Sequence, residues 1–173
     1  MDTRDDTGTA DMAGSADDQA TPARLRGLPS RLLSLTAVHA DRLVSEGLAG
    51  ADARKWHYAV LVALEEFGPA SQAALSDRTR VYRSDLVAVI NQLADRGLVE
   101  RAPDPADRRR NVITMTPQGR RHLRRLDTLL SAIQDDLLAP LTQPERDQLA
   151  QLLTRLLEHH TRTPAPSTDD RPA

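Results

Sequence analysis

The chain contains no cysteine, which excludes a disulfide framework, a thiolate metal site and a cysteine-based redox switch. Aromatic residues are nearly as scarce, because the 173 residues include one tryptophan, two tyrosines and one phenylalanine. Leucine and alanine at helical spacing must therefore build most of the interior. No apolar run approaches the ~18 residues of a membrane-spanning helix, and the N-terminus has no signal-peptide core. These absences predict a cytoplasmic protein without a membrane partner.

The net charge of −2 hides an uneven distribution of charged residues. Residues 1–20 contain six aspartates and one arginine, whereas residues 69–125 contain twelve arginines and six acidic residues. Positive charge gathered in one segment is typical of a surface that binds phosphate groups. Residues 1–27 and 161–173 are polar and lack a hydrophobic period, so both are predicted to be disordered tails, the first of them acidic.

A helix-turn-helix pattern occupies the first part of the basic segment. Residues 71–78 predict a short helix with Ser71 as its N-cap, and a four-residue link leads to a second helix over 83–96. The apolar residues of the second helix recur at i, i+3, i+4 and i+7 and are Leu86, Val89, Ile90 and Leu93. Gly97 stands where the helix needs a left-handed C-terminal residue. Two helices joined by a tight turn, the second with a polar outer face, are typical of DNA-binding proteins.

Two short β-prone runs follow the helices, at residues 98–101 and 112–115. They flank a turn-rich segment that ends in three arginines, which predicts a β-hairpin with a basic tip. Helix, turn, helix and hairpin together form a winged helix, here over residues 69–116. The predicted fold class is therefore mainly α with a small β-hairpin wing.

Helical periods flank the winged helix over residues 28–68 and 117–160. The first range predicts two helices, one that Gly47 ends and one that begins after Asp52 as N-cap. The second range predicts a helix capped by Thr116 and, after a break, a further helix rich in leucine. These leucines exceed what one winged helix can bury, so the flanking helices are predicted to support it and to form a homodimer.

Three motifs carry a resemblance to a known family: GLVER at 97–101, DPADRR at 104–109 and TMTPQG at 114–119. They resemble the signature of the MarR family of dimeric bacterial transcription regulators, and the resemblance covers roughly residues 28–160. The chain departs from the family at Arg80, where the family usually has glycine, and at Tyr82, where it usually has a small capping residue. A non-glycine residue in a left-handed turn costs on the order of 1 kcal/mol, so a locally different turn is expected.

The predicted DNA contacts lie on the second helix, at the start of the first, and at the hairpin tip. They are Ser71, Gln72, Tyr82, Arg83, Ser84, Val87, Ala88, Asn91, Arg108, Arg109 and Arg110. The tip arginines are expected to reach a minor groove or its phosphates. Asp107 is expected to hold the Arg109 guanidinium and so fix the tip, a pairing that the family pattern also implies. Arg83 suits a phosphate or a guanine edge, and Asn91 suits adenine.

The resemblance also implies an effector cavity between the dimer base and the DNA-binding head. His39, Trp56 and His57 lie in the helices that border it in the family, and a planar aromatic acid or phenol would suit such a lining. Ordinary core or interface packing of these three residues stays open. His122, among four arginines, is predicted to be solvated.

No pattern for catalysis, for a cofactor or for a metal site occurs in the sequence, which argues against an enzyme. The sequence therefore predicts a homodimeric transcriptional repressor that binds double-stranded DNA at a pseudo-palindromic operator and is released by a small aromatic or phenolic ligand. The alternative is a winged-helix protein used for protein contact or architectural DNA binding, without an effector.

Overall fold

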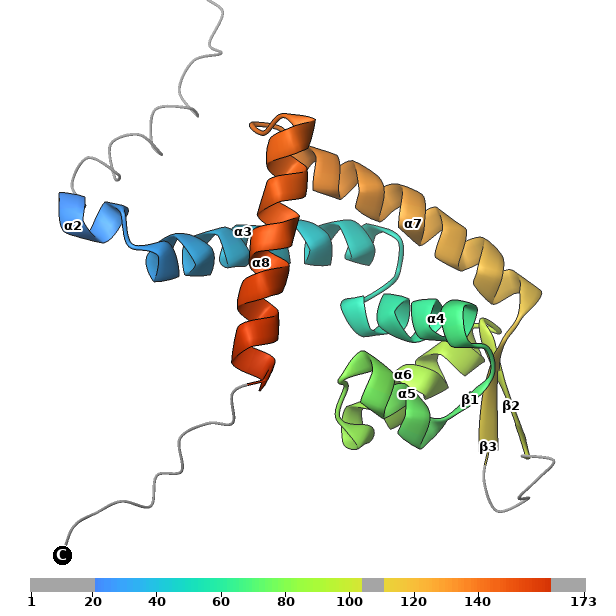
Figure 1. Ribbon diagram of the computed structural model, residues 1–173. Coiled ribbons are helices and arrows are strands. Elements are labelled where there is room, and N and C mark those ends of the chain that lie inside the picture. The colour runs from blue at the N-terminus through green and yellow to red at the C-terminus, as the bar shows by residue number, and fades with distance from the viewer. Residues whose placement is uncertain (1–20, 104–110, 163–173) are drawn as a thin grey trace, which may run out of the picture.

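The computed structural model describes residues 21–103 and 111–162. The elements in this part of the chain are α2 (Ala23–Arg26), α3 (Pro29–Gly50), α4 (Lys55–Phe67), β1 (Ala70–Ser71), α5 (Gln72–Thr79), α6 (Arg83–Asp95), β2 (Val99–Pro103), β3 (Asn111–Met115), α7 (Pro117–Leu137) and α8 (Gln143–Arg162). The predicted fold class is confirmed, because one small antiparallel sheet accompanies helices in a winged helix (Figure 1). None of the helices in the described ranges is long and apolar enough to cross a bilayer.

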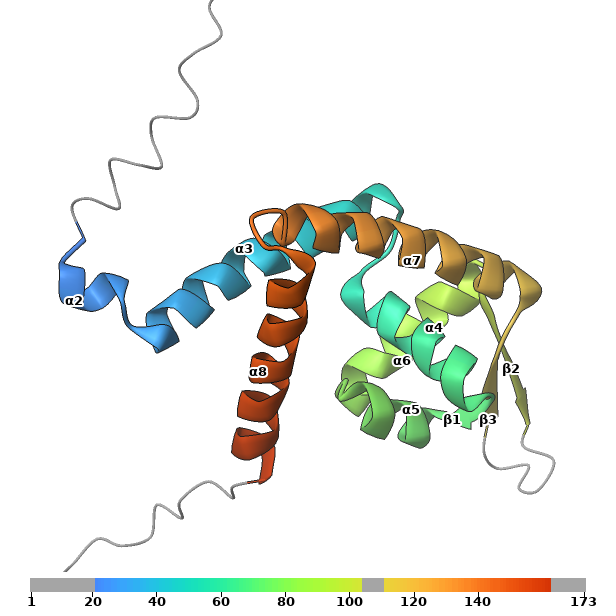
Figure 2. The same ribbon diagram turned by 45° about the horizontal axis from the view of Figure 1, so that its top comes forward.

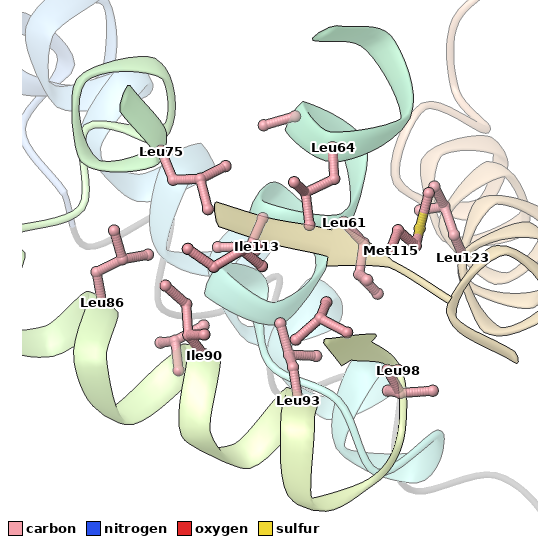
Figure 3. Packing of buried hydrophobic residues seen from close by; sticks show 14 of the residues in the cluster. Leu61, Leu64, Leu75, Leu86, Ile90, Leu93, Leu98, Ile113, Met115 and Leu123 are labelled. Atoms are coloured by element: carbon pink, nitrogen blue, oxygen red, sulfur yellow. The ribbon is translucent and has the colours of Figure 1, made fainter. Parts of the chain in front are cut away.

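The hydrophobic core lies where α4, α5 and α6 meet the sheet. The four apolar residues predicted to line the second helix are all buried: Leu86, Val89, Ile90 and Leu93. Leu61 of α4, Leu75 of α5 and Ile113 of β3 face them from the other elements (Figure 3). Leucine is the most frequent residue of this core, as the composition predicts, and valine, alanine, isoleucine and one methionine fill the rest of it. This packing fixes which side of α6 faces solvent.

The predicted hairpin is present as β2 and β3, with Val99 opposite Met115 and Pro103 opposite Asn111. A third strand, β1, pairs with β3 through Ala70 and Ser71 and was not predicted. Two residues are too few to show an alternating pattern, so the sequence carries no signal for this strand. The strand ties the start of α5 to the hairpin.

The caps around the helix-turn-helix agree with the sequence. Ser71 caps α5, because its Oγ accepts a hydrogen bond from the backbone N–H of Ala74 at 3.2 Å. Thr116 caps α7 in the same way, accepting from the N–H of Gly119 at 3.0 Å. Gly97 has φ 65°, the predicted left-handed conformation after α6. Arg80 has φ 54°, so the turn keeps the left-handed geometry and does not differ locally as expected.

The predicted end of the first long helix at Gly47 is wrong, because α3 continues to Gly50. Gly47 serves close packing instead: a Cβ there would lie 2.3 Å from Cδ1 of Ile133 on α7. The predicted N-cap of the next helix is also wrong. Asp52 has φ 53° and lies in the corner before α4, which begins at Lys55. The corner is decided by long-range contacts that local cap signals do not contain.

Three further expectations require correction. The predicted disordered tail over 1–27 contains the short helix α2 in its described part, where alanine, leucine and arginine have high helix propensity. His122 is predicted to be solvated but is only 4% exposed. It lies on the inner face of α7, one position before the buried Leu123, although arginines surround it in sequence. Residues 161 and 162, predicted to be part of a disordered tail, belong to α8.

Gly119 is expected to be the residue of α7 least tolerant of substitution. A Cβ there would lie 2.1 Å from the carbonyl oxygen of Leu98, a backbone atom that cannot turn aside. Gly119→Ala should therefore lower the free energy of unfolding by about 1–3 kcal/mol, the usual cost of overpacking. Gly47→Ala is the control, since its contact is the movable end of a side chain. Urea denaturation in which both variants lose equal stability would contradict this prediction.

Candidate nucleic-acid interface

The outer face of α6 presents five of the predicted DNA contacts side by side. Arg83, Ser84, Val87, Ala88 and Asn91 are all exposed, while the opposite face of the helix is buried. The spacing of 84, 87, 88 and 91 places them on one stripe along the helix. A helix with one buried face and one exposed polar face, held in a helix-turn-helix, has the form that enters a major groove.

The turn before α6 is held by side-chain hydrogen bonds. Ser76 Oγ donates to the carbonyl oxygen of Val81 at 2.7 Å, and the Val81 side chain is buried. Tyr82, by contrast, is 81% exposed, and its backbone carbonyl accepts from the N–H of Leu86. The hydroxyphenyl group of Tyr82 is therefore free to contact a ligand beside the N-terminus of α6, where the helix dipole favours anions.

Two arginines flank this N-terminus without a salt-bridge partner among the described residues. Arg80 and Arg83 are exposed, and the four ion pairs within those ranges involve other side chains. Phosphate groups would supply the missing anions. The predicted contacts Ser71 and Gln72 lie at the start of α5 and are half-buried, and Ser71 is committed to its cap. Asp107, Arg108, Arg109 and Arg110 lie outside the described residues.

A hydrogen bond joins the outer face of α6 to the hairpin. The guanidinium of Arg101 on β2 donates to Oδ1 of Asn91. Arg101 was not among the predicted contacts. A strand pattern predicts which face of the sheet a side chain lies on, but it does not identify the residue of another element that the side chain reaches. The bond places a further cation, in addition to Arg80 and Arg83, at the edge of the candidate interface.

A pocket of about 480 Å³ lies at the corner where α3, α4 and α6 meet. Its lining residues are Ala49, Asp52, Ala53, Arg54, His57, Gln92, Asp95 and Arg96. Of the three predicted effector contacts, only His57 lines it. His39 is exposed on α3, and Trp56 is 47% exposed on α4. Arg96 closes the corner by donating to the Asp52 carbonyl oxygen, and its guanidinium lies 3.4 Å from the Asp52 carboxylate.

His57 connects α4 to α6 through both ring nitrogens. Nδ1 accepts from the backbone N–H of Arg54 at 3.2 Å, so the proton of the neutral ring is on Nε2. Nε2 then donates to Oε1 of Gln92 at 2.8 Å. Burial lowers the pKa of His57, although the bond to Gln92 raises it. Burial also lowers the pKa of His122, whose Nδ1 lies 3.2 Å from the donating Nη2 of Arg125. Its Nε2 has no hydrogen-bond partner among the described residues.

Acid is expected to destabilise the fold through these two histidines. Both have a pKa below 6.5 in the folded state, so the unfolded chain takes up protons first as the pH falls. The contribution of the two neutral histidines to the free energy of unfolding should be complete above about pH 6.5. It should be lost progressively as the pH falls from there through the lowered folded-state pKa values. Urea denaturation between about pH 7.5 and 5 checks this. A variant carrying His57→Gln and His122→Gln should show a flatter profile, and an equal decline in both proteins would contradict the assignment.

The geometry defines the class of the protein, a winged helix whose second helix is exposed and has arginines beside its N-terminus. The chain belongs to the MarR family, whose model matches residues 46–110. It is similar in fold to a probable transcriptional regulator from Pseudomonas aeruginosa, with 32% identity and a TM-score of 0.68 over 77% of this chain and 99% of that one. Within the described residues no group of side chains could hold a metal ion.

Two curated relatives are transcription regulators. A putative transcriptional regulatory protein for the hcr operon of Thauera aromatica is 41% identical over 55% of this chain and 57% of its own length. The transcriptional repressor NicR of Pseudomonas putida is 30% identical over 58% of this chain and 64% of its own length. The chain therefore spans somewhat under two thirds of each of these relatives. The names of these relatives describe regulators and not enzymes.

Proposed function

We propose that this protein is a sequence-specific, homodimeric DNA-binding transcription regulator that acts as a repressor. The observation that carries the proposal is the outer face of α6, where five exposed residues, Arg83 among them, lie beside Arg80. Neither arginine has a salt bridge in the described ranges. The similarity to the repressor NicR supports the direction of regulation. The winged-helix unit supplies the reading head, and the flanking helices supply the dimer base.

The helices outside the winged helix support the homodimer. In Figures 1 and 2, α8 turns back from the end of α7 and runs apart from the winged helix. Four of its leucines are 40–67% exposed: Leu152, Leu153, Leu156 and Leu157. On α3, Leu32, Leu35 and Val38 are 46–66% exposed. Two copies of this chain that cover each other's leucines would remove this surface from water.

The corner pocket supports release by a small planar anion, such as an aromatic carboxylate or a phenolate. Arg54 and Arg96 supply positive charge there beside the carboxylates of Asp52 and Asp95, and Ala49 and Ala53 supply apolar surface. Because Gln92 and Arg96 belong to α6 and its end, a ligand in the pocket would act on the placement of the reading helix. Such a ligand shifts the protein only if it prefers one placement over the other.

Footprinting on the DNA beside the gene tests the proposal. We expect protection of a pseudo-palindrome with half-sites about 10–10.5 bp apart, because two-fold related helices enter successive major grooves on one face of the duplex. Added benzoate, 4-hydroxybenzoate or phenol should release the DNA. Binding that is independent of sequence would contradict the regulator, whereas specific binding unaffected by these compounds would contradict only the ligand class.

A further inference from the structure

The hydrogen bond between α6 and the hairpin has a defined chemical direction. Arg101 Nη2 donates to Oδ1 of Asn91. A guanidinium can only donate, so the atom of the Asn91 amide that faces it must be the oxygen. The amide nitrogen, with two N–H donors, is the remaining polar end of Asn91. It has no acceptor among the described residues.

The sheet register explains why Arg101 reaches the helix. Arg101 lies opposite Ile113, and paired residues of an antiparallel sheet project from the same face. Ile113 is 2% exposed and packs in the core beneath α6. Arg101 therefore lies on the inner face of the hairpin, beyond the last core residue, while Glu100 beside it lies on the outer face with Thr114.

Asn91 occupies the last position of the exposed stripe on α6. Reading adenine through a bidentate contact requires the amide oxygen to accept from the N6 amino group and the amide nitrogen to donate to N7. In this structure the oxygen already accepts from a cation. An adenine amino group would approach the same oxygen as a second donor beside a positive charge. Guanine presents acceptors at O6 and N7, which match the free N–H donors.

We propose that Arg101 is a specificity-determining positioning residue, which holds Asn91 as a donor and so makes it read guanine in place of adenine. The sequence alone favours adenine for Asn91, and the hairpin reverses that preference. The inference rests on the proposed function, since it concerns how the DNA sequence is read. The hydrogen bond from Arg101 also links β2 of the hairpin to α6, so one base contact depends on both elements.

Selection from a randomised duplex library, performed with the full-length protein, tests this inference. The wild type should prefer guanine over adenine by about fivefold or more at one position in each half-site. Arg101→Met keeps the apolar stem but removes the donors, and it should lower this ratio to one or below while other positions keep their preferences. Asn91→Ala should abolish discrimination at that position. The double variant should match Asn91→Ala.

Glu100→Met is the matched control, because it changes the same strand on the face away from α6 and should leave the guanine preference intact. Melting temperatures identify variants that fail to fold. Arg101→Met that binds all sequences more weakly but with unchanged base preference would overturn the inference and show a phosphate contact. A wild type that selects a sequence without this guanine would overturn it too. A wild type that enriches no sequence would overturn the proposed function itself.

Discussion

Arginine in place of both Leu153 and Leu156 should convert the proposed homodimer to a monomer. The two leucines are 40% and 47% exposed on α8, so the substitutions remove little packing within one chain. In a dimer they would bury two charges in each subunit against apolar surface, which is strongly unfavourable. Operator affinity should fall on the order of a thousandfold, towards the non-specific range, because only one half-site remains bound. Light scattering and gel-shift titration measure the two effects.

The control for this experiment is the same pair of charges on the opposite side of α8. Gln151→Arg with Thr154→Arg adds arginines at exposed positions that face away from the leucines. This variant should remain dimeric and should bind the operator at least as well as the wild type. Should the leucine variant stay dimeric, α8 would not belong to the dimer base.

Reversal of charge at Arg83 should produce the second large loss. Arg83 is exposed at the first position of α6 and has no ion-pair partner within the described ranges. Loss of such a contact costs about 1–3 kcal/mol, and a dimer carries two copies. Arg83→Glu should therefore weaken operator binding on the order of a hundredfold or more. The dependence of the binding constant on salt should also become shallower, because fewer counterions are released.

Arg121→Glu is the matched control for charge. Arg121 is exposed on α7 and has no ion-pair partner within the same ranges, but α7 does not present a face to the proposed groove. It changes net charge by the same amount and should weaken binding only slightly. Equal losses in the two variants would mean that overall charge, and not a contact from α6, controls the affinity.

The winged helix was predictable because its signals are local. Ser71 marks the start of α5 and Gly97 marks the end of α6. Four apolar residues at helical spacing determine the buried face of α6. Each signal acts within a few residues of its cause. The end of α3 was not predictable in this way. Gly47 suggests a helix end in sequence, but the residue is there to let Ile133 approach from a helix far along the chain.

The candidate site also has one part that local sequence signals predict and one part that depends on long-range packing. The outward residues of α6 follow from the helical period alone, so their shared exposure is predicted correctly, while their contact with DNA stays a prediction. Their partners do not follow, because Arg101 and Asn91 are ten residues apart and Arg96 and Asp52 are 44 residues apart. Such pairs depend on how strands and helices pack. Of the three predicted effector contacts only His57 lines the corner pocket of the single chain, so the effector site stays a prediction.

Arg80 lowers the melting temperature of this protein. Its left-handed conformation, φ 54°, costs on the order of 1 kcal/mol relative to glycine. For a domain of this size that corresponds to roughly 2–4 °C of melting temperature. Glycine at position 80 would recover this margin but would delete a cation from the face proposed to meet DNA. Directed evolution for thermal stability would therefore be expected to replace Arg80 early. The selected variants would have higher melting temperatures and lower affinity for DNA.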